Sequence, residues 1–225
     1  GTDTQDITFT ITEVNDAPVA NAGSFSTDED IDVSYTLTWD DGDPWGSAAD
    51  DQDSTFAIVD STLHGTLSLD VSTGALTYDP DDDYNGSDSF TFTVTDDGTT
   101  NGTSDPLTST ASTVSITVNA INDAPVLSSI SAQTTSEDSD MEVNLSGTDV
   151  DIATNGQSLT FTATSGDESM VLVSITNPGT STATLSLDVQ DDANGTVTVS
   201  VTVSDGNDGT DTQDITFTIT EVNDA

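Results

Sequence analysis

Carboxylates are the residues with the clearest chemical capacity in this 225-residue chain, and they collect in short runs between stretches of alternating polar and apolar residues. The sequence holds 42 Asp and Glu residues, no Lys, no Arg and one histidine, which gives a formal charge of −42. Short carboxylates in turns are common ligands of Ca²⁺, a hard cation that takes roughly six to eight oxygen atoms. We therefore expect the clustered acids to bind Ca²⁺. An acidic surface that is only solvated is the alternative.

The same composition argues against several classes of function. Nucleic acids and anionic membranes bind cationic residues, and this sequence has no Lys or Arg to offer. The only histidine, His64, stands in no recognisable nucleophile motif, so we do not expect an enzyme. The acids after Asp205 do not follow the EF-hand pattern. The sequence has no cysteine and hence no disulfide, and domains of about 100 residues have a core large enough to fold without one.

An internal repeat sets the organisation of the chain. Asn-Asp-Ala-Pro occurs at residues 15–18 and 122–125, and a third copy begins at residue 223. Residues 1–17 are identical to residues 209–225. Each interval has the length of a small domain. We predict that residues 1–16 are the last strand and linker of a preceding repeat, that residues 17–121 form one domain, and that residues 122–225 form a second domain ending in the next linker.

Period-two alternation predicts strands throughout both domains. Residues 4–12 alternate clearly, and we expect a strand that is either a frayed remnant or pairs with a neighbouring molecule. A second inward-facing row is predicted at Ile31, Val33, Tyr35, Leu37 and Trp39. Further strands are expected near residues 55–59, 65–69, 75–78, 89–95 and 114–118, and near 141–145, 159–163, 171–175, 183–187 and 197–203. Because no helical period appears, the pattern favours β-sandwiches of immunoglobulin-like type.

Four motifs carry a resemblance to a known family. They are Asn-Asp-Ala-Pro, Thr-x-Glu-Asp at 27–30 and 135–138, Thr-Gly-Ala-Leu-Thr-Tyr at 73–78, and Tyr-Asn-Gly-x-Asp-Ser-Phe at 84–90. Together they resemble the bacterial cadherin-like tandem repeats of large extracellular Ca²⁺-dependent adhesins. The second domain departs from the pattern, since Ala193 replaces the tyrosine. The resemblance implies an all-β fold of tandem immunoglobulin/cadherin-like Greek-key β-sandwiches, about seven strands each, strung end to end.

The resemblance also implies which residues hold Ca²⁺. The candidates lie in the linkers, at strand entries and in the loops at the ends of each sandwich: Glu13, Asn15, Asp16, Glu29, Asp30, Asp41, Asp43, Asp51, Asp53, Asp79, Asp81, Asp96, Asn122, Asp123, Glu137, Asp138, Asp149, Asp151, Asp191, Asp192, Asp205, Glu221, Asn223 and Asp224. In the first domain the Asp-x-Asp pair is ambiguous between residues 41/43 and 51/53. Asp191 and Asp192 are assigned to the position of Asp79 and Asp81.

We hypothesise that Ca²⁺ near Asn122 and Asp123 bridges the two domains. It would join Glu29 and Asp79 or Asp81 to Asp149, Asp151 and Asp205. The middle linker has Ala120 where the other two have Glu13 and Glu221, so we expect weaker binding there.

The sequence predicts structural extender repeats of an extracellular filament or adhesin on a bacterial cell surface. The expected partners are neighbouring repeats of the same array, with self-association possible, and neither nucleic acid nor direct membrane contact. One alternative is a homophilic or carbohydrate-binding adhesion module. Another is a fibre subunit that donates residues 4–12 to a neighbouring chain by β-strand addition.

Overall fold

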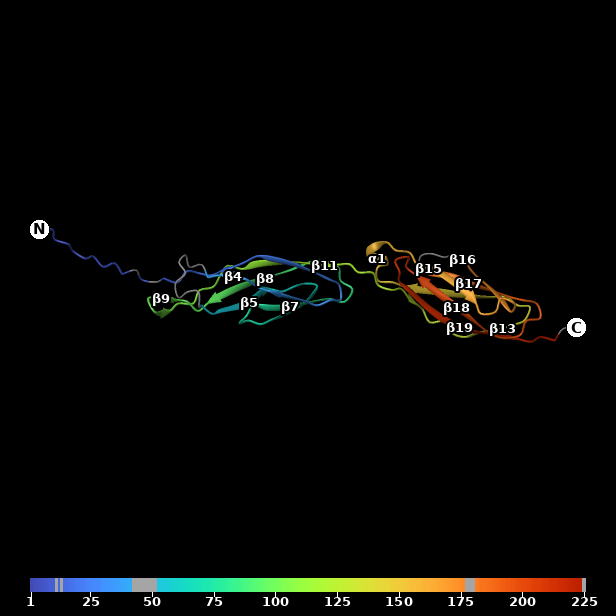
Figure 1. Ribbon diagram of the computed structural model, residues 1–225. Coiled ribbons are helices and arrows are strands. Elements are labelled where there is room, and N and C mark those ends of the chain that lie inside the picture. The colour runs from blue at the N-terminus through green and yellow to red at the C-terminus, as the bar shows by residue number, and fades with distance from the viewer. Residues whose placement is uncertain (11, 13, 42–51, 177–180, 224–225) are drawn as a thin grey trace. The chain divides into compact units, whose positions relative to one another are not determined.

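Short alternating segments bounded by Gly, Asp and Asn turns form two separate β-sandwich units in the computed structural model (Figure 1). The model describes residues 1–10, 12, 14–41, 52–176 and 181–223. One unit covers Gly1–Ile121 and the other covers Asn122–Ala225. Among the described residues, no helix is both long and apolar enough to cross a membrane.

The first unit contains a four-stranded sheet in the order β2-β11-β8-β5 and a three-stranded sheet in the order β3-β7-β6. Two short ladders, β1-β4 and β10-β9, complete it. Its strands are β1 (Val19–Ala20), β2 (Gly23–Asp28), β3 (Val33–Thr36), β4 (Trp39–Asp40), β5 (Ser54–Asp60), β6 (Gly65–Leu69), β7 (Ala75–Pro80), β8 (Gly86–Asp96), β9 (Thr99–Thr100), β10 (Thr103–Ser104) and β11 (Ser112–Asn119).

The second unit contains two four-stranded sheets, in the orders β12-β14-β17-β16 and β13-β19-β18-β15. Its strands are β12 (Val126–Leu127), β13 (Gln133–Ser136), β14 (Met141–Thr148), β15 (Thr160–Ser165), β16 (Val171–Thr176), β17 (Thr182–Val189), β18 (Gly195–Ser204) and β19 (Thr210–Thr220). A single helical turn, α1 (Ile152–Asn155), lies between β14 and β15. The sequence did not predict this turn, since four residues are too few to show a helical period.

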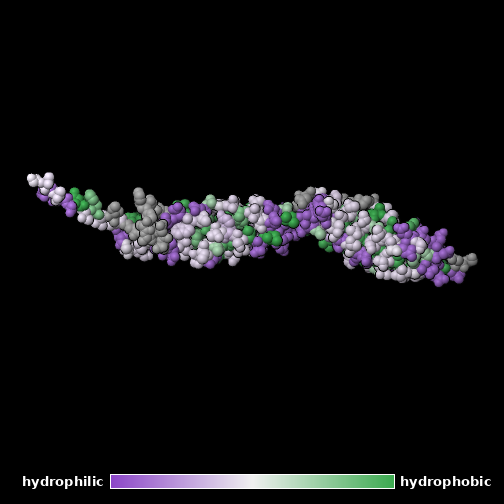
Figure 2. All heavy atoms as spheres, viewed as in Figure 1, coloured by the Kyte–Doolittle hydropathy of each residue, from purple (hydrophilic) through white to green (hydrophobic). Residues whose placement is uncertain are grey.

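The inward residues of the predicted strands form one core in each unit, which confirms the all-β sandwich fold. Phe90, Phe92 and Val94 of β8 are buried in the first core, as are Val199 and Val201 of β18 in the second. The outward residues of the same strands are mostly threonine and serine, so the visible faces have the pale colours of residues with hydropathy near zero (Figure 2). Polar outward rows keep the sandwich faces in water and leave the acids concentrated at the strand ends.

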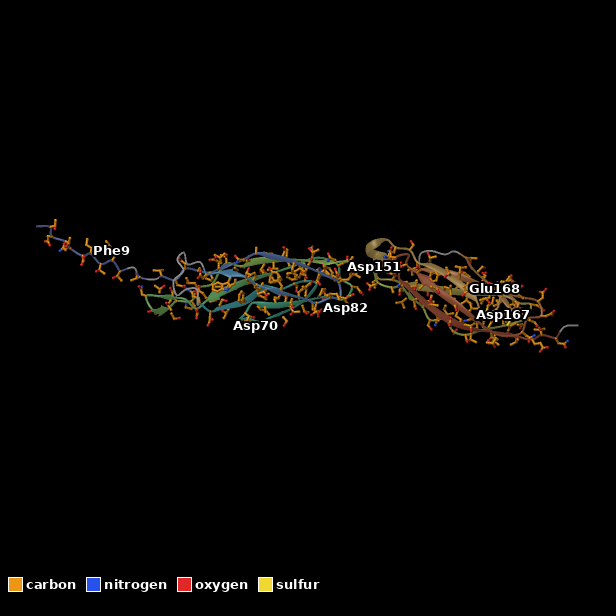
Figure 3. All side chains as sticks on the ribbon, viewed as in Figure 1. Phe9, Asp70, Asp82, Asp151, Asp167 and Glu168 are labelled. Atoms are coloured by element: carbon orange, nitrogen blue, oxygen red, sulfur yellow. The ribbon has the colours of Figure 1, made fainter. Side chains whose placement is uncertain are left out.

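One expected inward residue was wrong, and the described residues among 4–12 have no partner strand, as expected of a frayed remnant. Ile31 was expected to face inward but is 57% exposed, because it directly follows a left-handed residue, Asp30, and precedes the start of β3. Among the described residues from 1 to 14, none belongs to a strand. Phe9 there is 84% exposed and is drawn away from any sheet (Figure 3), whereas Phe217, its counterpart in the identical sequence of β19, is 1% exposed. An alternating segment becomes a strand only where a neighbouring strand and a core are present.

The same register relates the two units. Val19 and Ala20 pair with Asp40 and Trp39, just as Val126 and Leu127 pair with Thr148 and Gly147. Counting on from these pairs, Asp41 stands where Asp149 stands. The choice between residues 41/43 and 51/53 stays a prediction, because Asp43 and Asp51 lie outside the described residues. Asp53 pairs through its backbone with Asp97.

Candidate metal-binding ends of the two sandwiches

Asp205 and Asp96 lie where the linker that contains Asn122 or Asn15 enters their respective units. We call this the linker end of each unit. Asp205 directly follows β18 and is 5% exposed, and Asp96 is the last residue of β8 and is 3% exposed. Asp205 Oδ1 accepts the backbone N–H groups of Asn207 and Gly209 at 2.7 and 3.0 Å. Its Oδ2 accepts Asn122 Nδ2 at 2.8 Å, and this hydrogen bond is the main reason why the pKa of Asp205 lies below its ordinary value. The carboxylate is therefore held ionised at the end of the strand.

Three more acids belong to this end of the second unit: Asp123 lies in the linker, and Asp149 and Asp151 directly follow β14. Asp151 is 2% exposed and precedes α1 (Figure 3). Its Oδ2 accepts the backbone N–H of Asp123 at 2.8 Å, and its own N–H donates to Asp149 Oδ1 at the same distance. One carboxylate oxygen of Asp123 lies within 4.8 Å of one of Asp151. Asp149 Oδ2 is buried with no hydrogen-bond donor among the described residues.

The first unit repeats part of this arrangement. Asn15, 5% exposed, donates from Nδ2 to Asp96 Oδ1 at 3.0 Å and to the Asp105 carbonyl at 2.8 Å. Asp96 Oδ2 is buried, and among the described residues no donor reaches it. Asp41 is half-buried and Asp16 is exposed. The candidates Glu13, Asp43 and Asp51 lie outside the described residues, as does Asp224 in the last linker.

Two glutamines that the sequence did not single out take part in the hydrogen bonding at these ends. Gln157 Nε2 donates to Asn122 Oδ1 at 2.8 Å, and Gln52 Nε2 donates to Asn15 Oδ1 at 3.3 Å. Each end therefore contains a chain of hydrogen bonds from a glutamine to an asparagine to a buried aspartate. A glutamine in a polar loop has no distinctive spacing, so only the fold reveals this relation.

The opposite end of each unit is built around the Thr-x-Glu-Asp motif. Thr27 Oγ1 donates to the carbonyl of Ile31 at 2.8 Å, and Thr135 Oγ1 to that of Ser139 at 3.2 Å. The Asp of the motif is left-handed, with φ of 60° at Asp30 and 59° at Asp138. This tight turn directs the glutamate inward, so Glu29 and Glu137 are each 4% exposed.

Both buried glutamates accept a backbone N–H from the segment that follows the last strand. Glu29 Oε1 accepts Ile121 N at 2.5 Å and its Oε2 accepts Asn85 Nδ2 at 3.1 Å. Glu137 Oε1 accepts Val222 N at 2.5 Å. Glu221 and Asn223, which flank Val222, are exposed.

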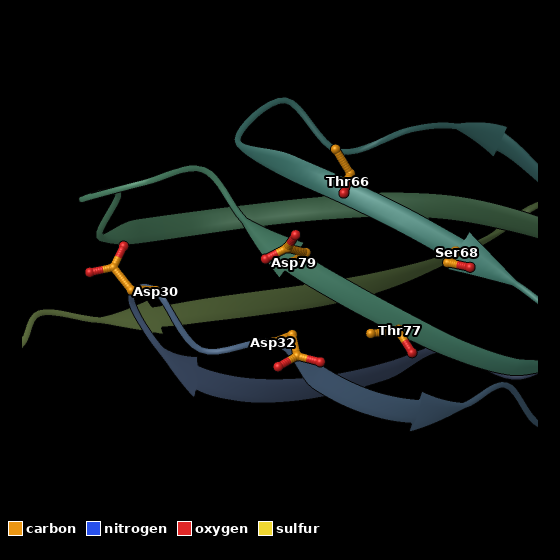
Figure 4. A pocket seen from close by; sticks show the side chains of 6 residues that line it. All are labelled: Asp30, Asp32, Thr66, Ser68, Thr77 and Asp79. Carbon is orange, nitrogen blue, oxygen red and sulfur yellow. The ribbon is translucent and has the colours of Figure 1, made fainter.

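Other predicted acids at this end lie on the surface. Asp30, Asp32 and Asp79 line an open hollow of about 380 Å³ with Thr66, Ser68 and Thr77 (Figure 4). Asp83 N donates to Asp30 Oδ1 at 3.0 Å. Asp81 and Asp138 are exposed as well.

Asp191 and Asp192 do not occupy the position of Asp79 and Asp81. Tyr84 N donates to the carbonyl of Asp81, and Ala193 N donates to that of Gln190. The residues of the second unit that match Asp79 and Asp81 are therefore Asp188 and Gln190. Asp191 and Asp192 match Asp82 and Asp83, and both Asp83 and Asp192 are left-handed, with φ of 57° and 56°.

Asp88 is a buried carboxylate that the sequence analysis missed. It is 8% exposed and accepts the backbone N–H groups of Leu63, His64 and Ser89 and the Tyr78 hydroxyl. Burial raises the pKa of Asp88, but these four donors lower it by more, so the net pKa lies below its ordinary value. Burial and the charge of Asp88 raise the pKa of Tyr78. The alternation of β8 could have revealed it, since Asp88 lies on the same inward face of the strand as Phe90 and Phe92.

The donor set at the strand ends fits Ca²⁺ rather than a softer metal. It consists of carboxylate and amide oxygens, and the sequence has no cysteine and only one histidine. Buried carboxylates are costly without a positive partner, and no Lys or Arg exists here to provide one. The described carboxylates instead use backbone N–H groups and amide side chains, which leaves oxygens such as Asp96 Oδ2 and Asp149 Oδ2 for a cation.

Comparisons with known proteins agree with this fold. A family model described as bacterial Ig domain matches residues 15–117 and again 122–218. A search of curated proteins finds no match. Among solved structures, PcdhgB3 EC1-4 matches with a TM-score of 0.57 and 19% identity over 95% of this chain and 51% of that one. Protocadherin gammaB7 EC3-6 matches with a TM-score of 0.56 and 18% identity over 93% and 49%.

These likenesses bear on the fold alone, because the sequence identities are low. They confirm the resemblance to cadherin-like and immunoglobulin-like repeats. The chain spans about half the length of these two structures.

Proposed function

Because this chain belongs to the family of bacterial Ig domains, whose model matches it twice, we propose that it forms structural extender repeats of an extracellular filament or adhesin. Ca²⁺ bound at the sandwich ends would stiffen the array. The proposal places the chain at a bacterial cell surface, with neighbouring repeats of the same array as its main partners.

One observation carries the proposal. In a chain of formal charge −42 without Lys or Arg, five carboxylates at the sandwich ends are at most 5% exposed: Glu29, Asp96, Glu137, Asp151 and Asp205. At an effective dielectric constant of about 20, two such charges about 4 Å apart repel by about 4 kcal/mol. A divalent cation turns this cost into attraction, so folded units and bound Ca²⁺ favour each other.

Stiffening follows from where the ligands are attached. The linker residues Asn122 and Asp123 hydrogen-bond to Asp205 and Asp151. The segment after β11 is held by Glu29 through Ile121. A cation that took ligands from a linker and from the repeats on either side of it would remove the rotational freedom that short linkers otherwise leave between domains.

A calcium titration of the 225-residue chain tests the proposal. Calorimetry in low-salt buffer should detect Ca²⁺ binding, and thermal unfolding should shift upward with Ca²⁺ concentration. Asp151→Asn should reduce binding, whereas Glu168→Gln, in an exposed turn, should not. Absence of binding heat and of any thermal shift in the parent chain would reject the proposal.

The segment before Asn15 supports a proposal of its own. Residues 2–12 carry the sequence that forms β19 in the second unit, where Ile215 and Phe217 are 3% and 1% exposed. We assign residues 1–16 to the last strand and linker of another repeat of this type. Donation to a second copy is the competing possibility. In an intact chain β19 already fills that position intramolecularly, which favours its own strand over one from another molecule.

Size-exclusion chromatography with light scattering separates these alternatives. A strand donor forms oligomers that disappear when residues 1–12 are deleted, whereas an extender elutes as a monomer with or without them. The expectation that the chain is not an enzyme stays a prediction.

A further inference from the structure

Asp96 and Asp205 occupy equivalent positions but use their carboxylate oxygens differently. Residues 85–96 and 194–205 align without a gap, and both aspartates end a central strand. Both are buried, at 3% and 5% exposure. Equivalent ligands are expected to be equally available to a cation, so any difference in their hydrogen bonds is informative.

Asp96 concentrates its hydrogen bonds on one oxygen. Oδ1 accepts Asn15 Nδ2 at 3.0 Å, Gly98 N at 3.2 Å and Leu107 N at 2.9 Å. Oδ2 is buried, and no donor among the described residues reaches it. In the first unit, one oxygen of this carboxylate therefore has no hydrogen bond to give up when a cation binds.

Asp205 uses both of its oxygens. Oδ1 accepts the two backbone N–H groups of Asn207 and Gly209, and Oδ2 accepts Asn122 Nδ2 at 2.8 Å. Asn122 must present its nitrogen, because its carbonyl oxygen would be repelled by the carboxylate. That carbonyl oxygen in turn accepts Gln157 Nε2 at 2.8 Å, which fixes the orientation of the amide.

We propose that Asn122 competes with the cation for Asp205 Oδ2, so that the two linker ends bind Ca²⁺ with different affinities. The end containing Asp96 fills first. At the end containing Asp205, Asp149 Oδ2 accepts no hydrogen bond, but Asp205 Oδ2 can join the cation only when Asn122 turns away, and Gln157 opposes that movement. This inference rests on the proposed Ca²⁺ binding and concerns how the same ends are regulated.

The linker sequences favour the same order independently. Glu13 precedes the Asn-Asp pair of the first linker by two positions, and Ala120 takes that place in the second. The second linker therefore has one carboxylate fewer than the first, and the Asn122 amide competes with the cation for Asp205 Oδ2. A graded response follows, in which the array begins to stiffen at low Ca²⁺ and completes the process only at higher Ca²⁺.

Calorimetric titration of the 225-residue chain with CaCl₂ tests this order. The parent chain should show two classes of sites, and Asn122→Ala should tighten the weaker class by about tenfold, the value expected when a hydrogen bond to a charged group no longer competes. Asn15→Ala is the matched control. It should give no such gain, because Asn15 does not occupy Asp96 Oδ2.

Gln157→Ala provides a second variant that leaves Asp205 and Asn122 in place. It should tighten the weaker class in the same direction, which keeps the inference testable if Asn122→Ala folds poorly. Weaker binding in both variants would make Asn122 a ligand and overturn the inference, as would a single class of sites in the parent chain. Failure of the proposed function looks different, since the parent chain would then bind no Ca²⁺ at all.

Discussion

Glu29 accepts the backbone N–H of Ile121 at 2.5 Å across 92 positions of sequence, and the carboxylate that makes this bond is 4% exposed. Glu137 and Val222 repeat the arrangement in the second unit. A buried acid at the start of each sandwich thus holds the segment that leaves it.

Replacing this acid should release that segment. Glu29→Gln keeps the shape of the side chain but removes the charge and places an N–H₂ group opposite one of the two donors, Ile121 N or Asn85 Nδ2, so both bonds cannot be kept at full strength. We expect a loss of about 1.5–3 kcal/mol in the free energy of unfolding of the first unit, the usual worth of a hydrogen bond to a charged group. Hydrogen exchange in the presence of chelator should show faster exchange of the Ile121 amide.

The control for that variant is Glu142→Gln, an exposed outward residue of β14, which should change stability by less than about 0.5 kcal/mol. Unchanged exchange at Ile121 in Glu29→Gln would mean that the linker is held by other contacts.

Phe9 and Phe217 offer a matched pair within one sequence. Each is the ninth residue of one of two identical 17-residue segments, yet the exposed fractions of their side chains are 84% and 1%. Phe217→Ala should destabilise the second unit by about 3–5 kcal/mol through loss of buried area and the cavity left behind. Phe9→Ala should leave thermal unfolding of the chain unchanged. A comparable loss from Phe9→Ala would show that residues 2–12 are packed in a sandwich after all.

These pairs show what the sequence could and could not predict. Alternation located the strands, because inward and outward residues differ in polarity at every second position. It misplaced Ile31, since the left-handed turn at Asp30 interrupts the alternation before β3 begins. It could not decide between Asp41 and Asp51, because that choice depends on the pairing of β1 with β4. The roles of Gln52 and Gln157 could not be predicted, because their hydrogen-bond partners, Asn15 and Asn122, lie far away in the sequence.

Asp88 predicts a different response to acid in the two units. Its folded pKa is lowered, so its contribution to stability is fully present above the unfolded pKa of 3.8 and is lost as the pH falls through the lower folded pKa. Val197 stands at the equivalent position of the second unit. Between about pH 5 and about pH 2, the first unit should therefore lose stability through protonation of Asp88, and Asp88→Asn should remove this part of the pH dependence.

Asp88→Asn should also lower the free energy of unfolding of the first unit by about 2–4 kcal/mol at pH 7, because an amide nitrogen cannot accept the donors that one carboxylate oxygen accepts. Asp60→Asn, an exposed acid on β5, is the control. Equal acid sensitivity of the parent chain and Asp88→Asn would contradict this account.

Gly98 tests how closely the first linker end is packed. A Cβ at this position would overlap Asn15 Oδ1, so Gly98→Ala should push Asn15 away from Asp96. We expect weaker Ca²⁺ binding at this end, measured by calorimetry, with the sandwich still folded. Gly102→Ala, in the neighbouring β9-β10 hairpin, meets nothing within 4 Å and costs only the strain of its left-handed φ of 75°. Equal binding by both variants would separate Asn15 from the site.

The central claim is that Ca²⁺ stiffens the array, and small-angle X-ray scattering of the 225-residue chain tests it most directly. With saturating Ca²⁺, the scattering should fit one rigid particle, and with chelator it should require an ensemble of arrangements of two sandwiches. Circular dichroism should show the same β content in both conditions. Scattering curves that stay identical and equally rigid after chelation would contradict the account.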